Sequence, residues 1–272
     1  MANDRNNRGS DGQGEAGKPV IVAIGASAGG VQALQAFIGS LPPTTGAAYV
    51  VVVHLDPQRR SELPAILGAR TRMPVVQVEG TQKLAADHVY VIPPDRRLQM
   101  IDHEVSAVEF EQPHGQRSPI DLFFRSVAER IGDGFAVVLS GAGSDGAIGV
   151  RAVKEAGGII LVQDPNEAEW ASMPRSVIAT GVADFVLPAR DLAQRLVELL
   201  RVKQSTPVPD ASNIDEELLR RILAHLRVRT GHDFSKYKQS TVLRRIARRM
   251  QVTRTDQLKD YYDFLRENAE EA

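Results

Sequence analysis

The sequence contains no cysteine, and aromatic residues make up only 5% of its 272 positions. The absence of cysteine excludes disulfide bonds, thiolate metal sites and a cysteine nucleophile. No apolar run approaches the roughly 20 residues of a membrane-spanning helix, and the N-terminus lacks the apolar segment of a signal peptide. The formal net charge of −1 gives the chain as a whole no attraction to nucleic acid or membranes. We therefore expect a cytoplasmic protein.

The histidines lack metal-binding spacing, so we expect no metal and no cofactor.

Composition and hydrophobic pattern divide the chain into four segments. Residues 1–17 are rich in Gly, Asn, Asp and Arg and are expected to be a disordered lead-in. Residues 18–203 alternate short β-branched runs with helical stretches. Residues 204–213 are typical of a linker because they combine prolines with small polar residues and show no periodicity. Residues 214–272 have helical patterns, so a small all-α domain is expected after the linker.

The first large segment contains continuous apolar runs typical of strands that are buried on both faces. The strongest runs are Val20–Ile24, Tyr49–Val53 and Phe135–Leu139, and each precedes a helical pattern. This order predicts an α/β fold with a doubly wound, mostly parallel sheet. Residues 88–110 contain two alternating runs around a polar turn near positions 102–104, and they predict an antiparallel hairpin excursion.

The six residues 25–30, GASAGG, lie between the first buried run and a helical pattern. They match the G-x-S-x-G pattern of a nucleophile elbow, in which a sharp turn lifts the serine hydroxyl above the sheet. The following helix N-terminus would supply N–H groups for an oxyanion. A dinucleotide-binding turn would require glycine where Ser27 stands, and a plain glycine-rich turn is also open. The motif alone does not decide between these interpretations.

A serine nucleophile needs a base and a carboxylate that orients the base. Of the six histidines, only His54 directly follows a strongly buried run, and Asp145 follows the third such run. Because the carboxyl ends of parallel strands meet at one edge, we expect Ser27, His54 and Asp145 to converge there. The competing role for Asp145 is the N-cap of a helix over residues 145–156. Asp56 is close to His54 in sequence but poorly placed in a turn, and Asp164 is the runner-up.

Seven segments between about Val20 and Lys203 carry a family resemblance: IGASAGG, VVVHLD, VYVIPPD, SPIDLFFRSVA, LSGAGSDGAIGV, QDP and MP…GVADFVLP. Together they resemble the catalytic domain of the CheB-type chemoreceptor glutamate methylesterases. The resemblance implies hydrolysis of glutamate methyl esters, often with deamidation of receptor glutamines, and places the catalytic triad at Ser27, His54 and Asp145. No receiver domain is expected before Lys18, so regulation by phosphorylation in cis is not expected.

Two positions depart from the family pattern. The family usually has threonine after the nucleophile, where this chain has Ala28, and G-M-G where this chain has Ala142 between two glycines. If the methionine acts through its backbone N–H, Ala142 can still donate to the oxyanion. If its side chain shapes the pocket, the substrate range changes. We therefore predict that the backbone N–H groups near Ala28 and Ala142 form the oxyanion hole.

The tail, about Ile214 to Glu267, resembles the N-terminal helical domain of CheR-type glutamate methyltransferases through TGHDFSKYK and TVLRRIARRM. No S-adenosylmethionine-binding fold follows, so no methyltransferase activity is expected, and the chain is either a fragment of a longer fusion or a short form.

The helix predicted over 240–250 carries two basic stripes. They comprise Arg244, Arg245, Arg248 and Arg249. The resemblance implies docking of an acidic receptor helix. One alternative is a solvated basic face. RNA binding is a less favoured alternative, because the helix lacks aromatic residues for stacking on bases.

The leading hypothesis is a serine hydrolase that demethylates glutamate methyl esters on chemoreceptor-like proteins. Its expected partners are helices of methylated receptors, without nucleic acid and without direct membrane insertion. A non-catalytic module that binds receptor helices is the alternative, and a nucleotide-binding protein is the third hypothesis. Labelling of Ser27 by a serine-directed phosphonate separates the first two, and a melting shift with a dinucleotide would indicate the third.

Overall fold

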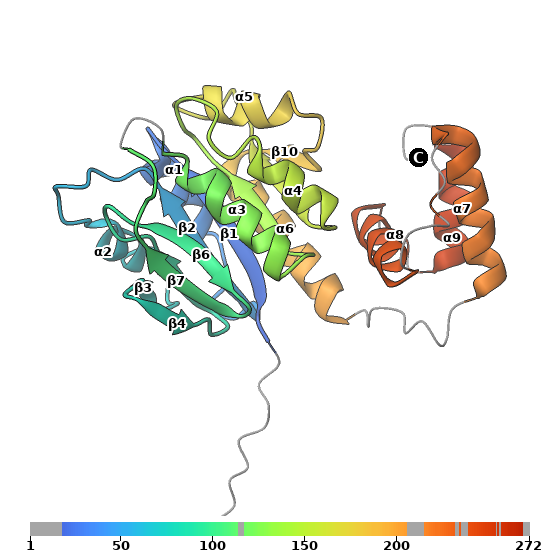
Figure 1. Cartoon of the computed structure of the whole chain (residues 1–272), viewed down its shortest axis with the longest axis horizontal. Helices are drawn as coiled ribbons and strands as arrows, with labels where there is room; N and C mark the ends of the chain where they lie inside the picture. The colour runs from blue at the N-terminus through green and yellow to red at the C-terminus, as the bar shows by residue number, and fades with distance from the viewer. Residues whose placement is uncertain are drawn as a thin grey trace, which may run out of the picture.

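The computed structural model describes residues 18–113, 117–205, 215–231, 234, 239–253, 255 and 257–268. They form an α/β domain followed by a separate group of helices (Figure 1). The predicted lead-in, residues 1–17, and most of the predicted linker lie outside the described residues.

Seven parallel strands form the main sheet of the α/β domain. They are β1 (Val20–Ala26), β2 (Ala47–Val53), β3 (Val75–Gln77), β5 (His88–Val91), β8 (Phe135–Val138), β9 (Ile159–Gln163) and β10 (Phe185–Leu187). Their order across the sheet is β10-β9-β8-β1-β2-β5-β3, and each neighbouring pair is parallel. Along the chain, β2, β3 and β5 are added on one side of β1, and β8, β9 and β10 are then added on the other side. Ligands of open α/β sheets bind beside such a reversal of strand order.

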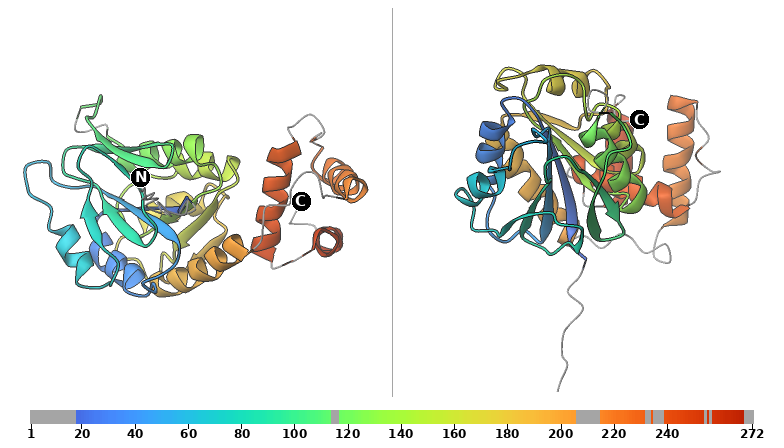
Figure 2. Two further views of the ribbon diagram at one scale, coloured as in Figure 1. Left: turned by 90° about the horizontal axis from the view of Figure 1, so that it is seen from below. Right: turned by 60° about the vertical axis from the view of Figure 1, so that its left-hand side comes forward.

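Helices cover both faces of this sheet. They are α1 (Gly30–Ile38), α2 (Leu63–Gly68), α3 (Pro119–Arg130), α4 (Gly149–Glu155), α5 (Ser172–Ile178) and α6 (Ala189–Ser205). Helices α1, α2 and α6 lie on one face, and α3 and α4 lie on the other (Figure 2). The central strands β1, β2 and β8 are buried almost throughout because both of their faces meet helices. The predicted doubly wound, mostly parallel α/β fold is confirmed.

A small antiparallel sheet packs against α3. Its strands are β4 (Thr81–Lys83), β6 (Arg97–Ile101) and β7 (Glu104–Val108), in the order β4-β7-β6. The predicted hairpin is confirmed for β6 and β7, whose turn holds Asp102 at φ 55°. The prediction is wrong for His88–Val91, which forms β5 of the parallel sheet between β2 and β3. A segment of only four residues carries too little periodicity to separate a hairpin strand from a buried parallel one.

The C-terminal helices are α7 (Glu216–Thr230), α8 (Gln239–Thr253) and α9 (Leu258–Glu267), which confirms the predicted helical segment. The Asp215 carboxylate caps α7 by accepting hydrogen bonds of 3.1 Å from the N–H groups of Glu217 and Leu218. The helices share an apolar core of their own that includes Ile222, Ile246 and Leu265. Within the described residues, every helix is too short or too polar to cross a bilayer.

Candidate active site

The loops that carry Ser27, His54 and Asp145 leave the main sheet at one edge. Strand β1 lies between β2 and β8, so the three loops follow three adjacent strands. Ala26 at the end of β1 is in register with Val53 at the end of β2, and Ser27 and His54 therefore begin their loops at the same level. Asp145 lies in the loop that follows β8. The three residues are thus gathered at the carboxyl edge, where the strand order reverses.

Ser27 lies in a tight turn between β1 and α1. Its backbone N–H donates to the Ser140 carbonyl at 3.0 Å, and its carbonyl accepts from the Gly30 N–H at 2.8 Å. Gly29 has φ 67°, and a Cβ at this position would lie 2.8 Å from the Trp170 ring. Only glycine combines this left-handed conformation with so close a contact. The half-buried Ser27 is therefore held directly before the N-terminus of α1.

The loop after β8 lies against the Ser27 turn. The Ser140 hydroxyl donates to the Ala28 carbonyl at 3.1 Å, and a Cβ on Gly141 would lie 3.0 Å from the Ser27 Cβ. Within the part of the chain that the structure describes, the backbone N–H groups of Ala28 and Ala142 have no hydrogen-bond partner. Both residues are exposed. Two backbone donors on the loops around Ser27 are thus not engaged within the described residues.

His54 and Asp145 are hydrogen-bonded to each other. His54 Nε2 lies 2.8 Å from Asp145 Oδ2, and the side chains are 40% and 9% exposed respectively. A carboxylate oxygen can only accept, so this contact places a proton on Nε2 and leaves the Nδ1 lone pair free to accept one. The contact therefore selects the tautomer in which Nδ1 can serve as a base.

The Asp145 carboxylate also caps α3. Its Oδ2 accepts from the Ile120 N–H at 3.1 Å, and its Oδ1 accepts from the Asp121 N–H at 2.9 Å. The positive end of the α3 dipole lies beside this carboxylate. Ser118, the residue at the N-cap position of this helix, makes no capping hydrogen bond with its side chain. The helix expected to begin at Asp145 begins at Gly149, so Asp145 caps a neighbouring helix and not its own.

The sequence did not indicate a role for Asp121. Like Asp145, it accepts hydrogen bonds from backbone N–H groups at the start of a neighbouring helix. Its Oδ1 accepts from the backbone N–H groups of Ile148 at 3.0 Å and Gly149 at 2.6 Å, which ties α3 to the start of α4. Burial raises the pKa of the Asp121 carboxyl above its ordinary value of 3.8, and the nearby Asp145 charge raises this pKa further. The Gly149 hydrogen bond opposes these effects without cancelling them. Asp121 thus helps to fix the loop that holds Asp145.

Replacing Asp121 with asparagine should change how stability depends on pH. The folded-state pKa of Asp121 is raised, so its contribution to stability is complete below pH 3.8 and is lost as the pH rises through the folded-state pKa. Asparagine keeps an oxygen that can accept from Ile148 and Gly149 but does not ionise. The free energy of unfolding in urea should therefore increase for Asp121→Asn relative to wild type as the pH rises above 4. A difference in unfolding free energy that stays constant with pH would contradict this.

The two rival carboxylates are engaged elsewhere. Asp56 accepts from the N–H of Gln58 at 3.0 Å and pairs with Arg59 at 3.5 Å. Asp164 follows β9, which is separated from β1 by β8, and its Oδ1 accepts from the N–H of Asn166 at 2.8 Å. Neither carboxylate contacts His54, and the geometry favours Asp145 as its partner.

A cavity of about 190 Å³ adjoins His54. Arg96 and Arg117 line it, and Arg117 is held by a 2.6 Å ion pair with Asp95. On the other side of the site, Trp170 is 49% exposed next to the Ser27 turn. The sequence patterns did not indicate these residues. They lie in loops without periodicity, and only the presence of a single tryptophan could have drawn attention to Trp170.

The remaining predictions concern metals and the arginines of α8. Among the described residues, no group of three or more His, Asp or Glu side chains could hold a metal ion. Arg245 and Arg249 contact the α/β domain, far along the chain from α8. The side chains of Arg244 and Arg248 lie outside what the structure describes. Binding of an acidic receptor helix by these arginines therefore stays a prediction.

Comparison with known proteins gives a consistent result. A family model described as CheB methylesterase matches residues 22–196, and one described as CheR methyltransferase, all-alpha domain, matches residues 217–272. A putative protein-glutamate methylesterase/protein-glutamine glutaminase of Leptospira interrogans is 33% identical over 180 residues, covering 65% of this chain and 93% of that protein. The crystal structure of the Thermotoga maritima CheB methylesterase catalytic domain aligns with a TM-score of 0.62 at 32% identity, covering 66% of this chain and 98% of that one.

Longer relatives match over only part of their length. An uncharacterized 104.1 kDa protein of Rhodobacter capsulatus is 37% identical over 230 residues, covering 75% of this chain, but the chain spans 24% of that protein. A protein-glutamate methylesterase/protein-glutamine glutaminase of Burkholderia lata is 38% identical over 193 residues, covering 67% of this chain and 55% of that protein. The matched ranges lie within the predicted domains 18–203 and 214–272 but do not test their exact limits, which stay predictions. The chain belongs to the CheB methylesterase family, and a CheR-type all-alpha domain follows its methylesterase domain.

Proposed function

We propose that this chain is a protein-glutamate methylesterase in which Ser27 is the nucleophile, His54 the general base and Asp145 the residue that orients the base. The observation that carries the assignment is the 2.8 Å hydrogen bond between His54 and Asp145, at the strand ends beside the Ser27 turn. Family membership supports the reaction class, and the His54–Asp145 contact beside the Ser27 turn supports the proposed roles of the three residues.

The reaction begins with attack of Ser27 Oγ on the carbonyl carbon of a glutamate methyl ester. His54 Nδ1 takes the serine proton, and Asp145 at Nε2 stabilises the imidazolium that forms. The tetrahedral intermediate collapses when His54 gives that proton to the departing methoxide, which leaves as methanol. Water, activated by the same imidazole, then releases glutamate from the acyl-enzyme. An amide substrate would lose ammonia in the same steps, so glutamine deamidation belongs to the proposal.

The negative oxygen of the tetrahedral intermediate needs donors that are already in place. The open N–H groups of Ala28 and Ala142 lie on the two loops that meet at Ser27. Each donor of this kind stabilises the transition state by about 3–4 kcal/mol. Because both act through the backbone, they do not depend on the threonine and methionine usual in the family.

Replacing Ala142 with proline should lower kcat by about 10²-fold or more, because proline removes the N–H group. Replacement with methionine, the usual family residue, keeps the N–H and should keep the wild-type kcat. Methanol release by both variants, with melting temperatures to verify folding, tests the backbone role. A methionine variant that loses as much activity as the proline variant would assign the effect to the side chain.

The proposed substrates are methylated helices of chemoreceptor-like proteins, with the reaction in the cytoplasm. The Ser27 turn, the half-exposed Trp170 and the cavity beside His54 border one open edge, which a protein helix can approach.

The decisive experiment combines turnover with labelling. Methanol release from a methylated receptor measures hydrolysis, and a fluorophosphonate followed by peptide mapping identifies the activated serine. We expect steady methanol release and modification at Ser27. Receptor binding without either signal would instead indicate a non-catalytic receptor-binding module.

A further inference from the structure

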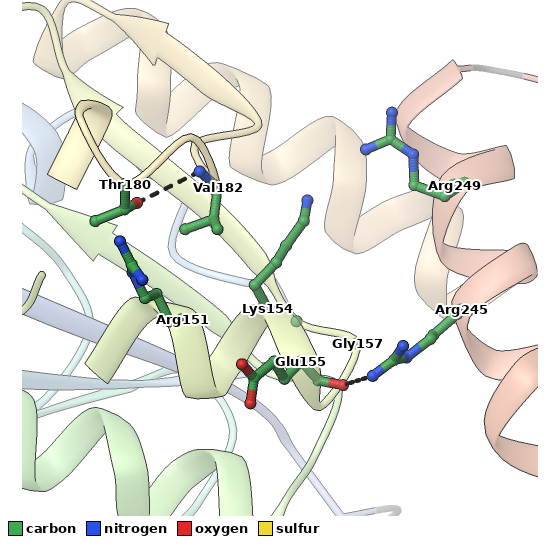
Figure 3. A pocket seen from close by; sticks show the side chains of 9 residues that line it. Arg151, Lys154, Glu155, Gly157, Thr180, Val182, Arg245 and Arg249 are labelled. Carbon is green, nitrogen blue, oxygen red and sulfur yellow. Dashed lines mark hydrogen bonds between the residues drawn. The ribbon is translucent and has the colours of Figure 1, made fainter. Parts of the chain in front are cut away.

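The arginines of α8 that the structure describes lie outside the core of the helical domain. Val242, Ile246 and Met250 occupy the face of α8 that is buried with α7 and α9. Arg245 and Arg249 are four residues apart and share another face of the helix. This face is turned toward the α/β domain (Figure 3).

Each of these two arginines has a defined partner on the α/β domain. Arg249 Nη1 lies 3.1 Å from Oδ1 of Asp184, a side chain that is 1% exposed. Lys154 Nζ contacts the same oxygen at 2.5 Å, and the N–H of Ile160 donates to Oδ2 at 3.0 Å. Arg245 donates to the main-chain carbonyl of Glu155 (Figure 3).

The chemistry of these partners explains why arginine fits them. Glu155 is the last residue of α4, and the carbonyls at a helix C-terminus carry the negative end of the helix dipole. Asp184 offers a carboxylate at the start of β10 that its own domain already holds in place. Arginine presents several donors in a rigid fork, so one side chain can contact a fixed acceptor without losing its charge.

The contacts of Arg245 and Arg249 are polar, and the packing around them is incomplete. A cavity of about 440 Å³ remains between the two domains, and Arg151, Lys154, Thr180, Arg245 and Arg249 are among the residues that line it. Domains move relative to each other unless their interface is large and hydrophobic. Attachment through partly exposed charges weakens as salt rises. The expected contact is therefore specific but reversible.

The contact lies at the edge of the sheet opposite the active site. Glu155 precedes β9 and Asp184 precedes β10, so both mark the amino ends of parallel strands. Ser27, His54 and Asp145 follow the carboxyl ends. A helical domain held at the amino edge therefore leaves the proposed catalytic site open to substrate.

We propose that Arg245 and Arg249 form an intrachain docking surface whose partner is the methylesterase domain itself, through Asp184 and the C-terminus of α4. While docked, these two side chains are occupied by the chain's own acceptors. An acidic helix could reach them only after the domains separate. The proposal is independent of the assignment of the catalytic residues.

The absence of cysteine allows a direct test on the full chain. Arg125→Cys on α3 and Lys259→Cys on α9, both at exposed positions, provide dye sites on the two domains for resonance energy transfer. Transfer should be high at low salt and should fall at high salt. Arg249→Glu should reduce transfer at low salt, whereas Arg229→Glu, at an exposed position on α7, should leave it unchanged.

A second variant guards against misfolding of the helical domain. Asp184→Asn removes the charge that Arg249 contacts but keeps an oxygen for the Ile160 N–H, and it too should reduce transfer. Circular dichroism verifies helix content, and if Arg249→Glu has lost helix, Asp184→Asn decides the question. Wild-type transfer in folded Arg249→Glu, or in Asp184→Asn, would overturn the proposal.

Discussion

Replacing Ser27 with alanine is expected to lower kcat for methyl-ester hydrolysis by about 10⁴-fold or more. The variant cannot form the acyl-enzyme, so water must attack the ester directly. The N–H groups of Ala28 and Ala142 remain, and they should support a slow residual reaction above the uncatalysed rate. Receptor affinity should stay near the wild-type value, because the side chain loses only one oxygen atom. Methanol release at saturating receptor and a separate binding measurement check both parts.

Ser144→Ala is the matched control for this prediction. Ser144 is exposed in the loop after β8, one residue before Asp145, and it should not contact the reacting ester. Its removal should leave kcat near the wild-type value. Full activity in Ser27→Ala, or an equal loss in Ser144→Ala, would show that the hydroxyl of residue 27 does not perform the chemistry.

The sequence was sufficient to place the three site residues at one edge because each follows a buried run. Continuous apolar runs such as Tyr49–Val53 predict strands covered on both faces, and parallel strands bring their following loops to a shared edge. The small residues around Ser27 similarly predict a tight turn. These features depend on local sequence and on general rules of α/β topology.

The features that the sequence could not supply depend on contacts between distant segments. Asp145 contacts the N-terminus of α3, 24 and 25 residues earlier, and no local pattern encodes that pairing. Which imidazole nitrogen of His54 bonds to Asp145 depends on the orientation of the ring, and the sequence does not determine that orientation. The position of β5 was mispredicted because its neighbours β2 and β3 are set by tertiary packing. The partners of Arg245 and Arg249 lie in another domain, so composition alone showed only a basic face.

Replacing Asp145 with asparagine is expected to lower kcat by about 10⁴-fold while leaving the fold in place. The asparagine amide can turn an N–H toward His54 Nε2, which favours the tautomer that carries its proton on Nδ1. That tautomer cannot accept the proton of Ser27. Methanol release measures the loss, and fluorophosphonate labelling of Ser27 should slow in parallel because the serine is no longer activated.

Asp145→Asn should also have a structural effect that can be separated from the catalytic one. The N-terminus of α3 loses a charged cap, which costs about 1 kcal/mol of folding stability. Urea unfolding measures this loss, and it is far too small to explain a 10⁴-fold fall in kcat, which corresponds to about 5.5 kcal/mol. Asp164→Asn is the matched control, because Asp164 follows the next strand, β9, and contacts Asn166 instead of His54. If Asp164→Asn were inactive and Asp145→Asn active, the orienting role would belong to Asp164, and the hydrogen bond between Asp145 and His54 would be purely structural.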